Sequence, residues 1–116
     1  MNLPPILAER RSADGVALDL AVTEDLDVFR GHFPGLPVLP GVAQVDWALR
    51  LAKSHGLIGA ATELRDFQVK FRNVIRPAIP LTLTLRWDAN KQRIRFDYHS
   101  DATLMSSGRL IVQAAS

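Results

Sequence analysis

The chain has 116 residues, a formal net charge of +2 and no cysteine. Disulfides, thiol catalysis and thiolate metal sites are therefore excluded, and so small a net charge gives no argument for nucleic-acid binding. The length fits one domain, residues 1–116, which is large enough to bury a core without cross-links. Hydrophobic residues make up 47% and charged residues 22%, as is ordinary for a soluble globular protein.

The beginning of the chain gives no targeting signal. Residues 1–5 carry no basic region followed by an apolar run, so no secretory signal is expected. No apolar run approaches the length that spans a bilayer. The lack of cysteine is compatible with a reducing compartment, and we expect a cytoplasmic protein without a membrane span.

Two short strands are expected first, over residues 6–11 and 15–22. Asp14 and Gly15 stand between these apolar runs, and an Asp-Gly pair in that position is typical of a hairpin. In the second run apolar residues alternate with alanine and aspartate, which predicts one buried face. The polar stretch 23–27 then leaves the sheet.

A loop rich in glycine and proline, residues 31–42, leads into a predicted helix over Gly41–His55 with Gly56 as its C-terminal stop. At 100° per residue, four apolar residues of this helix share one face: Val42, Val45, Leu49 and Ala52. The side that carries Trp47 and Leu51 is apolar as well. We therefore expect other structure to wrap most of the helix.

The second half of the chain changes to a period of two, which predicts four strands. They cover about residues 65–72, 81–87, 93–99 and 104–112. The order is therefore a hairpin, a loop, one long helix and a four-strand antiparallel meander. A sheet with one apolar face and a helix apolar on most sides bury each other, so the sheet should curl around the helix. This predicts an α+β protein with the hot-dog fold.

The central loop carries the most specific pattern in the chain. It contains His32–Gly35 and Pro37–Val42, followed by Asp46 fourteen positions after the histidine. This pattern resembles the 3-hydroxyacyl-(acyl carrier protein) dehydratases of fatty acid synthesis. A second and weaker motif of that family resembles Lys70–Arg72 followed by Pro77. The short length and the sequence after the loop are most similar to the small dehydratases of aryl polyene pathways.

The resemblance implies dehydration of 3-hydroxyacyl thioesters on acyl carrier protein to trans-2-enoyl thioesters. His32 suits the base that removes the C2 proton, and Asp46 suits the acid that protonates the departing C3 hydroxyl. The backbone N–H of Gly41 would hold the thioester carbonyl, and the carbonyl of Val38 would orient the histidine. The expected substrate-binding residues are Phe33, Val38, Gly41 and Val42.

The family also implies partners. A homodimer or higher homo-oligomer is expected, in which the histidine of one subunit meets the acid of the other. The acyl chain would arrive on the phosphopantetheine arm of an acidic acyl carrier protein. Candidates for docking that carrier are Arg10, Arg11, Arg65, Lys70, Arg72 and Arg76. No cofactor is expected, and the histidines at 32, 55 and 99 show no metal-ligand spacing.

Alternatives remain open at this point. Family members often carry glutamine four residues after the acid, where this chain has Arg50, and an Asp46–Arg50 ion pair would weaken an acid role. A hot-dog acyl thioesterase is a second possible enzyme. A non-catalytic acyl-carrier-binding subunit is a third possibility from a different class.

Overall fold

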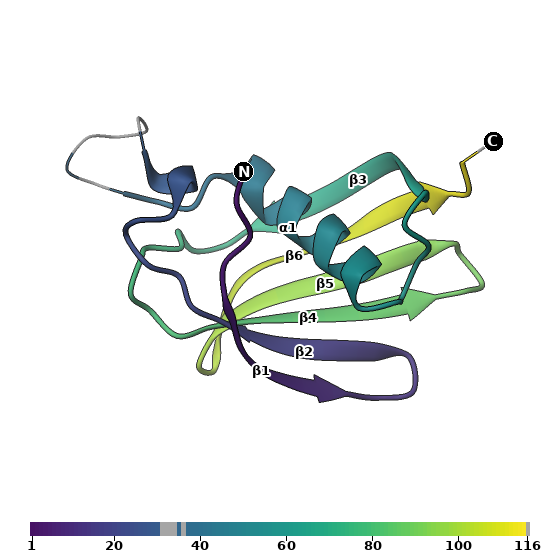
Figure 1. Cartoon of the computed structure of the whole chain (residues 1–116), viewed down its shortest axis with the longest axis horizontal. Helices are drawn as coiled ribbons and strands as arrows, with labels where there is room; N and C mark the ends of the chain where they lie inside the picture. Colours follow the sequence, from purple (N-terminus) through teal and green to yellow (C-terminus); the bar gives the residue numbers. More distant parts are fainter. Residues whose placement is uncertain (31–34, 36, 116) are drawn as a thin grey trace.

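The computed structural model describes residues 1–30, 35 and 37–115, which form a six-stranded antiparallel sheet and one long helix (Figure 1). The elements in chain order are β1 (Ile6–Arg11), β2 (Gly15–Leu20), the 3₁₀ helix η1 (Asp27–Phe29), α1 (Gly41–Ser54), β3 (Glu63–Phe71), β4 (Leu81–Asp88), β5 (Arg93–Ser100) and β6 (Thr103–Gln113). The predicted elements are all present, and their ends differ from the prediction by about two residues.

The strand order is β1-β2-β4-β5-β6-β3, so the predicted four-strand meander is wrong. Strands β4, β5 and β6 do form a meander, whereas β3 pairs with β6 at the far edge of the sheet. The connection of residues 72–80 explains the difference. It is too long for a hairpin and contains Pro77 and Pro80, and its buried Ile75 anchors it across the end of the sheet.

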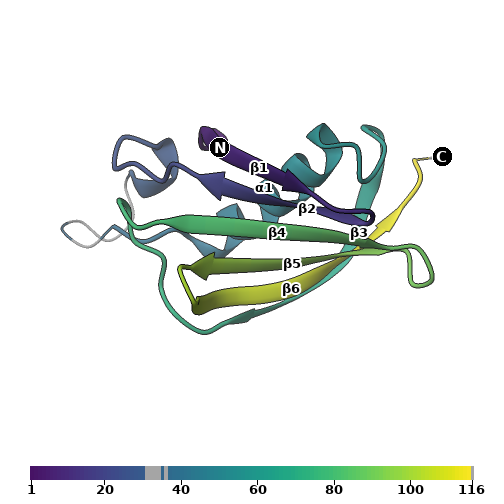
Figure 2. The same ribbon diagram turned by 90° about the horizontal axis from the view of Figure 1, so that it is seen from below.

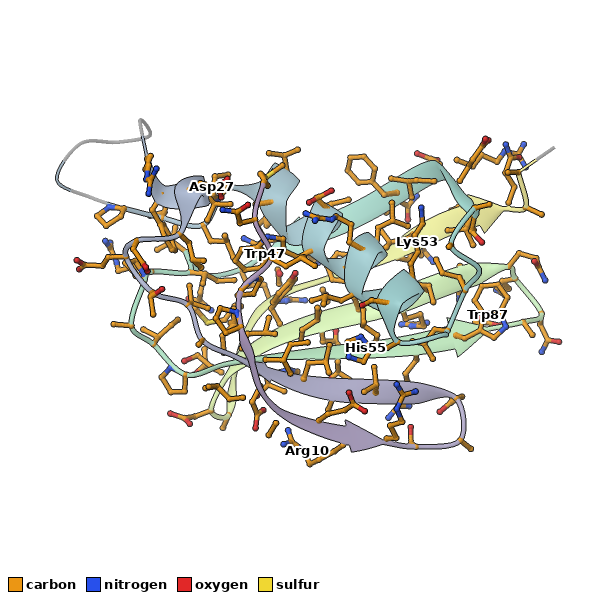
Figure 3. The ribbon with its side chains drawn as sticks, viewed as in Figure 1. Arg10, Asp27, Trp47, Lys53, His55 and Trp87 are labelled. Carbon is orange, nitrogen blue, oxygen red and sulfur yellow. The ribbon has the colours of Figure 1, made fainter. Side chains whose placement is uncertain are left out.

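Helix α1 crosses one face of this curved sheet. No helix of the described residues covers the opposite face of β4, β5 and β6 (Figure 2). This arrangement confirms the predicted hot-dog fold. Trp47, labelled in Figure 3, is fully buried, and its indole N–H donates to the carbonyl oxygen of Asn2 at 3.1 Å. The largest fully buried side chains around it include Leu18, Leu20, Leu51, Ile75, Leu83, Leu85, Ile94, Phe96, Tyr98 and Leu110.

The helix is wrapped less completely than its composition predicted. Ala43, Ala48 and Ala52 face the core and are fully buried, but Val42 is 66% exposed. Small alanines on the inner face let the helix lie close to the sheet, and the predicted Val42 face is left to line a groove. Gly56 ends the helix at a positive φ of 76°, as predicted. No helix in the described part of the chain is long and apolar enough to cross a membrane.

Candidate functional site

The approach to α1 is fixed by backbone hydrogen bonds of Leu39 and Pro40. The N–H of Leu39 donates to the carbonyl oxygen of Ile75 at 2.7 Å, which ties the loop to the connection after β3. Pro40 has an extended backbone at the N-cap, and its carbonyl oxygen accepts from the N–H groups of Ala43 and Gln44 at 3.1 and 3.2 Å. The start of the helix is therefore held at a defined position.

Two N–H groups at this helix start, those of Gly41 and Val42, have no acceptor among the residues that the structure describes. The positive end of the helix dipole lies at the same point, so an oxygen that gains negative charge would be stabilised there. One of the two groups, the N–H of Gly41, is the one that the sequence analysis assigned to a thioester carbonyl, and that role stays a prediction.

The absence of a side chain at Gly41 has a specific structural cause. A Cβ at this position would lie 2.5 Å from Cζ of Phe71, well inside van der Waals contact. Phe71 reaches the helix start from the last position of β3, and its side chain is 53% exposed. Glycine therefore lets an aromatic ring lie directly against the backbone that carries these N–H groups.

An apolar groove of about 380 Å³ runs from Gly41 along the outer side of α1. Residues of α1 form one wall and residues of the edge strand β3 form the other: Gly41, Val42, Val45, Asp46, Leu49, Leu64, Phe67, Val69 and Phe71. Asp46 is the one ionisable residue among them. An acidic residue that lines an apolar groove, just over one helical turn from N–H groups without an acceptor among the described residues, suits proton transfer to a bound chain.

Arg50 forms the ion pair with Asp46 that the sequence raised as an alternative. Its Nη1 lies 3.3 Å from Oδ2 of Asp46, and the two side chains are 42% and 32% exposed. The same Nη1 also donates to the carbonyl oxygen of Met1. The guanidinium therefore joins the Asp46 side chain to the start of the chain.

A buried polar network behind the helix start was not predicted from the sequence. The side-chain amide of Gln44 donates to the carbonyl oxygen of Leu39 at 3.2 Å, and its Oε1 accepts from the hydroxyl of Ser106 at 2.7 Å. The phenol of Tyr98 donates to the backbone carbonyl of Gln44 at 2.7 Å. Gln44 is 3% exposed, so these bonds satisfy groups that water cannot reach.

The electrostatics of this network keep the Tyr98 phenol neutral. Burial raises the pKa of Tyr98 well above its ordinary value, and the negative charge of Asp46 raises it further. A neutral phenol remains a hydrogen-bond donor to Gln44. The network joins strands β5 and β6 to the loop before α1, so it holds the helix start against the sheet.

The structure brings some of the predicted site residues together. Gly41, Val42 and Asp46 share the groove, while Val38 lines a second hollow of about 450 Å³ that meets the groove at Gly41 and Phe71. His32 and Phe33 lie outside the described residues. Sequence patterns missed Gln44 as a functional candidate, although a polar residue within an apolar helical stretch was a signal for it.

Comparison with known proteins supports one family. The sequence model of the ApeI-like family, described as ApeI dehydratase, matches residues 8–109. The 3-hydroxyacyl-[acyl-carrier-protein] dehydratase FabZ of Oenococcus oeni is 35% identical over 89 residues, which are 72% of this chain and 64% of that protein. FabZ of Novosphingobium aromaticivorans is 32% identical over 82 residues, 64% of this chain and 52% of that protein. The chain thus spans between about half and two thirds of these relatives.

Solved structures of other proteins can be superposed on nearly the whole chain. The dehydratase heterocomplex ApeI:P from Xenorhabdus doucetiae matches with a TM-score of 0.86 and 32% identity, over 97% of this chain and 98% of that one. Thioesterase superfamily member 2 from Mus musculus matches with a TM-score of 0.67 over 89% of this chain and 77% of that one. At 13% identity, the latter match shows a shared fold alone. The chain belongs to the ApeI-like dehydratase family.

Proposed function

We propose that this protein dehydrates 3-hydroxyacyl thioesters carried on acyl carrier protein to trans-2-enoyl thioesters, in fatty acid or aryl polyene-type lipid biosynthesis. One observation carries the proposal: in a chain of this family, Asp46 lines an apolar groove that begins at Gly41, whose N–H has no acceptor among the described residues. The relatives named as 3-hydroxyacyl-[acyl-carrier-protein] dehydratases support the substrate class. In this proposal, residues 1–116 form one catalytic domain that works in the cytoplasm.

The reaction needs three groups in fixed positions. His32 removes the proton from C2, and the electrons of that C–H bond form the C2–C3 double bond. The C3–O bond breaks, and its oxygen leaves as water with the proton that Asp46 delivers directly or through a bound water. The N–H of Gly41 holds the thioester oxygen as C2 becomes enolate-like, and the carbonyl of Val38 orients His32. Phe33 and Val42 complete the substrate-binding surface.

We propose that a second copy of the chain completes the site. Val42, Phe67 and Phe71 are 66%, 47% and 53% exposed around the groove, and β3 is an edge strand. Exposed apolar side chains beside an unpaired strand edge are features of an association surface. In a homodimer formed here, His32 of one subunit would meet Asp46 of the other. The solved ApeI:P heterocomplex suggests that a related chain is the alternative partner.

Activity and assembly are tested separately. The purified protein is given a 3-hydroxyacyl-loaded carrier protein, and enoyl thioester and free thiol are measured in the same reaction. Enoyl formation that falls by at least about 10²-fold in Asp46→Asn and in His32→Ala supports the proposal. Free thiol without enoyl product would instead indicate a thioesterase. Light scattering of the wild type and of Phe67→Glu then tests whether the groove face holds two copies together.

One observation favours a second candidate function. The Asp46–Arg50 ion pair occupies the carboxylate that the reaction would need, which fits an acyl-carrier-binding subunit that assembles with an active relative and performs no acid catalysis. That candidate predicts that the carrier binds while neither enoyl nor thiol is formed. The activity measurement above separates it from the dehydratase.

A further inference from the structure

Both backbone polar groups of Leu39 are hydrogen-bonded, although this residue lies in a loop. Its N–H donates to the carbonyl oxygen of Ile75 at 2.7 Å, and its carbonyl oxygen accepts from the side-chain amide of Gln44 at 3.2 Å. Because a trans peptide group is planar and rigid, these two bonds fix the peptide groups on either side of Leu39. One of them carries the Val38 carbonyl, and the other leads into Pro40 and the helix start.

The side-chain amide of Gln44 can point in only one direction. The Leu39 carbonyl accepts hydrogen bonds and cannot donate, so the amide nitrogen faces it and the amide oxygen faces Ser106. The hydroxyl of Ser106 donates to that oxygen at 2.7 Å. Gln44 is 3% exposed and Ser106 is fully buried, so water cannot replace either partner. A chain of hydrogen bonds thus runs from β6 through Gln44 to the Leu39 carbonyl.

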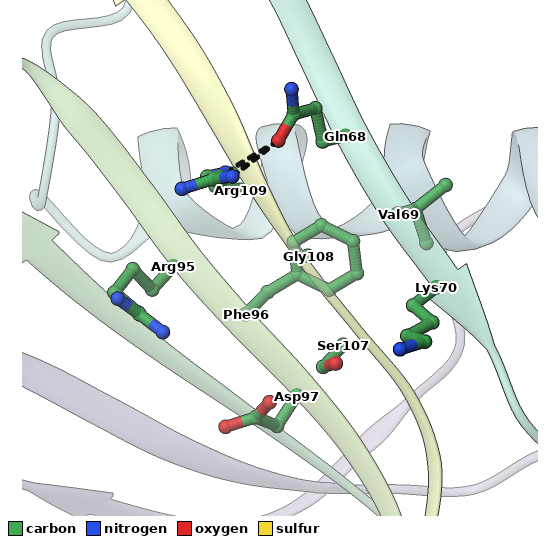
Figure 4. A pocket seen from close by; sticks show the side chains of 9 residues that line it. All are labelled: Gln68, Val69, Lys70, Arg95, Phe96, Asp97, Ser107, Gly108 and Arg109. Carbon is green, nitrogen blue, oxygen red and sulfur yellow. Dashed lines mark hydrogen bonds between the residues drawn. The ribbon is translucent and has the colours of Figure 1, made fainter.

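Ser106 reaches this position because of the alternation of side chains along β6. Ser107 and Arg109 line a hollow of about 510 Å³ on the outer face of the sheet (Figure 4). Neighbouring residues of a strand face opposite sides, so Ser106 and Leu110 face α1, and both are fully buried. The register of the sheet therefore brings Ser106 to the start of the helix, 62 positions along the chain from Gln44.

The peptide group between Pro40 and Gly41 extends this chain of contacts to the helix start. Its carbonyl oxygen accepts from the N–H groups of Ala43 and Gln44 at 3.1 and 3.2 Å. The N–H and C=O of a trans peptide point in opposite directions, so the Gly41 N–H points out of the helix start. The ring of Pro40 holds its φ at −62°, so the direction of the Leu39 carbonyl determines where that N–H lies.

We propose that Gln44 and Ser106 are positioning residues of the dehydration, which act through the Leu39 carbonyl on the backbone around Gly41. Neither residue lines the apolar groove. A misplacement of about 1 Å can cost about 10²-fold in rate. Contacts that strengthen only in the transition state affect kcat and leave substrate binding almost unchanged. This inference rests on the proposed function, because it concerns the thioester contact that the reaction requires.

The test compares Ser106→Ala with Ser107→Ala, which is the same change at the adjacent residue on the opposite face of β6. Values of kcat and KM are measured with a 3-hydroxyacyl N-acetylcysteamine thioester, so that binding of a carrier does not contribute. We expect Ser106→Ala to lower kcat about tenfold and to keep KM within about twofold of the wild type. Ser107→Ala should keep both values within about twofold.

A second comparison separates positioning from the loss of a buried hydrogen bond. The phenol of Tyr98 donates to the backbone carbonyl of Gln44 at 2.7 Å, the same length as the bond from Ser106. That carbonyl is also an acceptor within α1, so Tyr98→Phe removes a buried bond and leaves the Gln44 side chain held. We expect Tyr98→Phe to keep kcat within about threefold of the wild type, although it is destabilised in urea unfolding.

The outcomes are distinguishable. If the wild type forms enoyl product neither from the small thioester nor from a 3-hydroxyacyl-loaded carrier, the proposed function fails, and the inference fails with it. If the wild type is active and kcat of Ser106→Ala is unchanged, or falls no further than that of Tyr98→Phe, the positioning inference fails and the function stands. Gln44→Met cannot donate to the Leu39 carbonyl, so it should reproduce the fall in kcat and gives the same test if Ser106→Ala does not fold. Circular dichroism shows which variants are folded.

Discussion

Nη1 of Arg50 lies 3.3 Å from Oδ2 of Asp46. The residue proposed as the acid of the reaction therefore forms an ion pair with a residue one helical turn further along α1. Both side chains are partly exposed, and pairs of this kind contribute about 0.2–1 kcal/mol. The pair is therefore weak enough to open when a substrate enters the groove. While the pair is closed, the guanidinium competes with a substrate for the same carboxylate oxygen.

We predict that Arg50→Gln raises kcat/KM, by no more than about fivefold. Arg50 competes with a substrate for the Asp46 carboxyl group, and the partly exposed ion pair contributes at most about 1 kcal/mol. The value of kcat/KM is measured with a small thioester, so that binding of the carrier does not contribute.

The matched control for this prediction is Arg50→Lys. Lysine keeps the positive charge at the same helical spacing, so kcat/KM should stay within about twofold of the wild type. An equal rise in both variants would mean that Arg50 acts through its contact with Met1 and not through its charge. A fall of kcat/KM in Arg50→Gln would show that Arg50 assists the reaction and does not compete for Asp46.

The Gly41–Phe71 contact allows two roles of the glycine to be separated. Gly41→Ala places a Cβ 2.5 Å from the Phe71 ring, and we expect the exposed ring to swing aside, so that the free energy of unfolding changes by less than about 1 kcal/mol. We expect kcat/KM to fall by at least about tenfold, because the new methyl group obstructs the approach to the backbone donors. Urea unfolding and steady-state kinetics measure the two effects.

The double variant Gly41→Ala/Phe71→Leu gives the discriminating result. Leucine removes the ring that the new methyl group meets, so any loss caused by ring displacement should be restored. If Gly41 itself must approach the thioester, activity stays low in the double variant. Full recovery of activity would show that the glycine serves only to accommodate Phe71.

Much of the fold follows from local patterns in the sequence. The period-two pattern of residues 81–87 and 93–99 identifies β4 and β5, and Gly56 marks the end of α1. The position of β3 could not be read in this way, because a period of two identifies the faces of a strand and not its neighbours. The connection from β3 to β4 decides that position, through tertiary contacts of Ile75 and its backbone.

The candidate site likewise contains some contacts that local sequence patterns predict and others that they do not. The Asp46–Arg50 pair was predictable, because residues four apart on a helix are neighbours. The bonds of Gln44 to Ser106 and of Tyr98 to Gln44 were not, because they join residues 62 and 54 positions apart whose proximity depends on the sheet register. The cross-strand neighbours Arg86, Arg95 and Arg109 could not be predicted for the same reason, since they lie opposite one another only once β4, β5 and β6 are paired.

The Gln44 network makes a prediction about stability. Gln44→Leu leaves the Ser106 hydroxyl and the Leu39 carbonyl buried without these partners, so we expect the free energy of unfolding to fall by about 2–4 kcal/mol. The double variant Gln44→Leu/Ser106→Ala lacks one of these unpaired buried groups. Its loss of stability should therefore be smaller than the sum of the losses in the two single variants. Urea unfolding of all four proteins tests this; strictly additive losses would mean that the two side chains do not interact.

Asp19 gives the last prediction, on acid stability. Arg10 donates to its carboxylate at 2.8 and 2.9 Å and Thr82 at 2.8 Å, linking β1, β2 and β4. The Arg10 hydrogen bonds, followed by that of Thr82, lower the pKa of Asp19 from 3.8 to about 2.

Because the folded protein binds the Asp19 proton less readily than the unfolded chain, the contribution of this carboxylate is complete above about pH 5 and is lost as the pH falls from about 4 towards 2. Asp19→Asn removes the titrating group and keeps the shape of the side chain. The wild type should therefore exceed Asp19→Asn in free energy of unfolding at pH 6, and the excess should shrink towards pH 2. Urea unfolding at stepped pH measures that difference, and an excess that stays constant from pH 6 to pH 2 would contradict the lowered pKa.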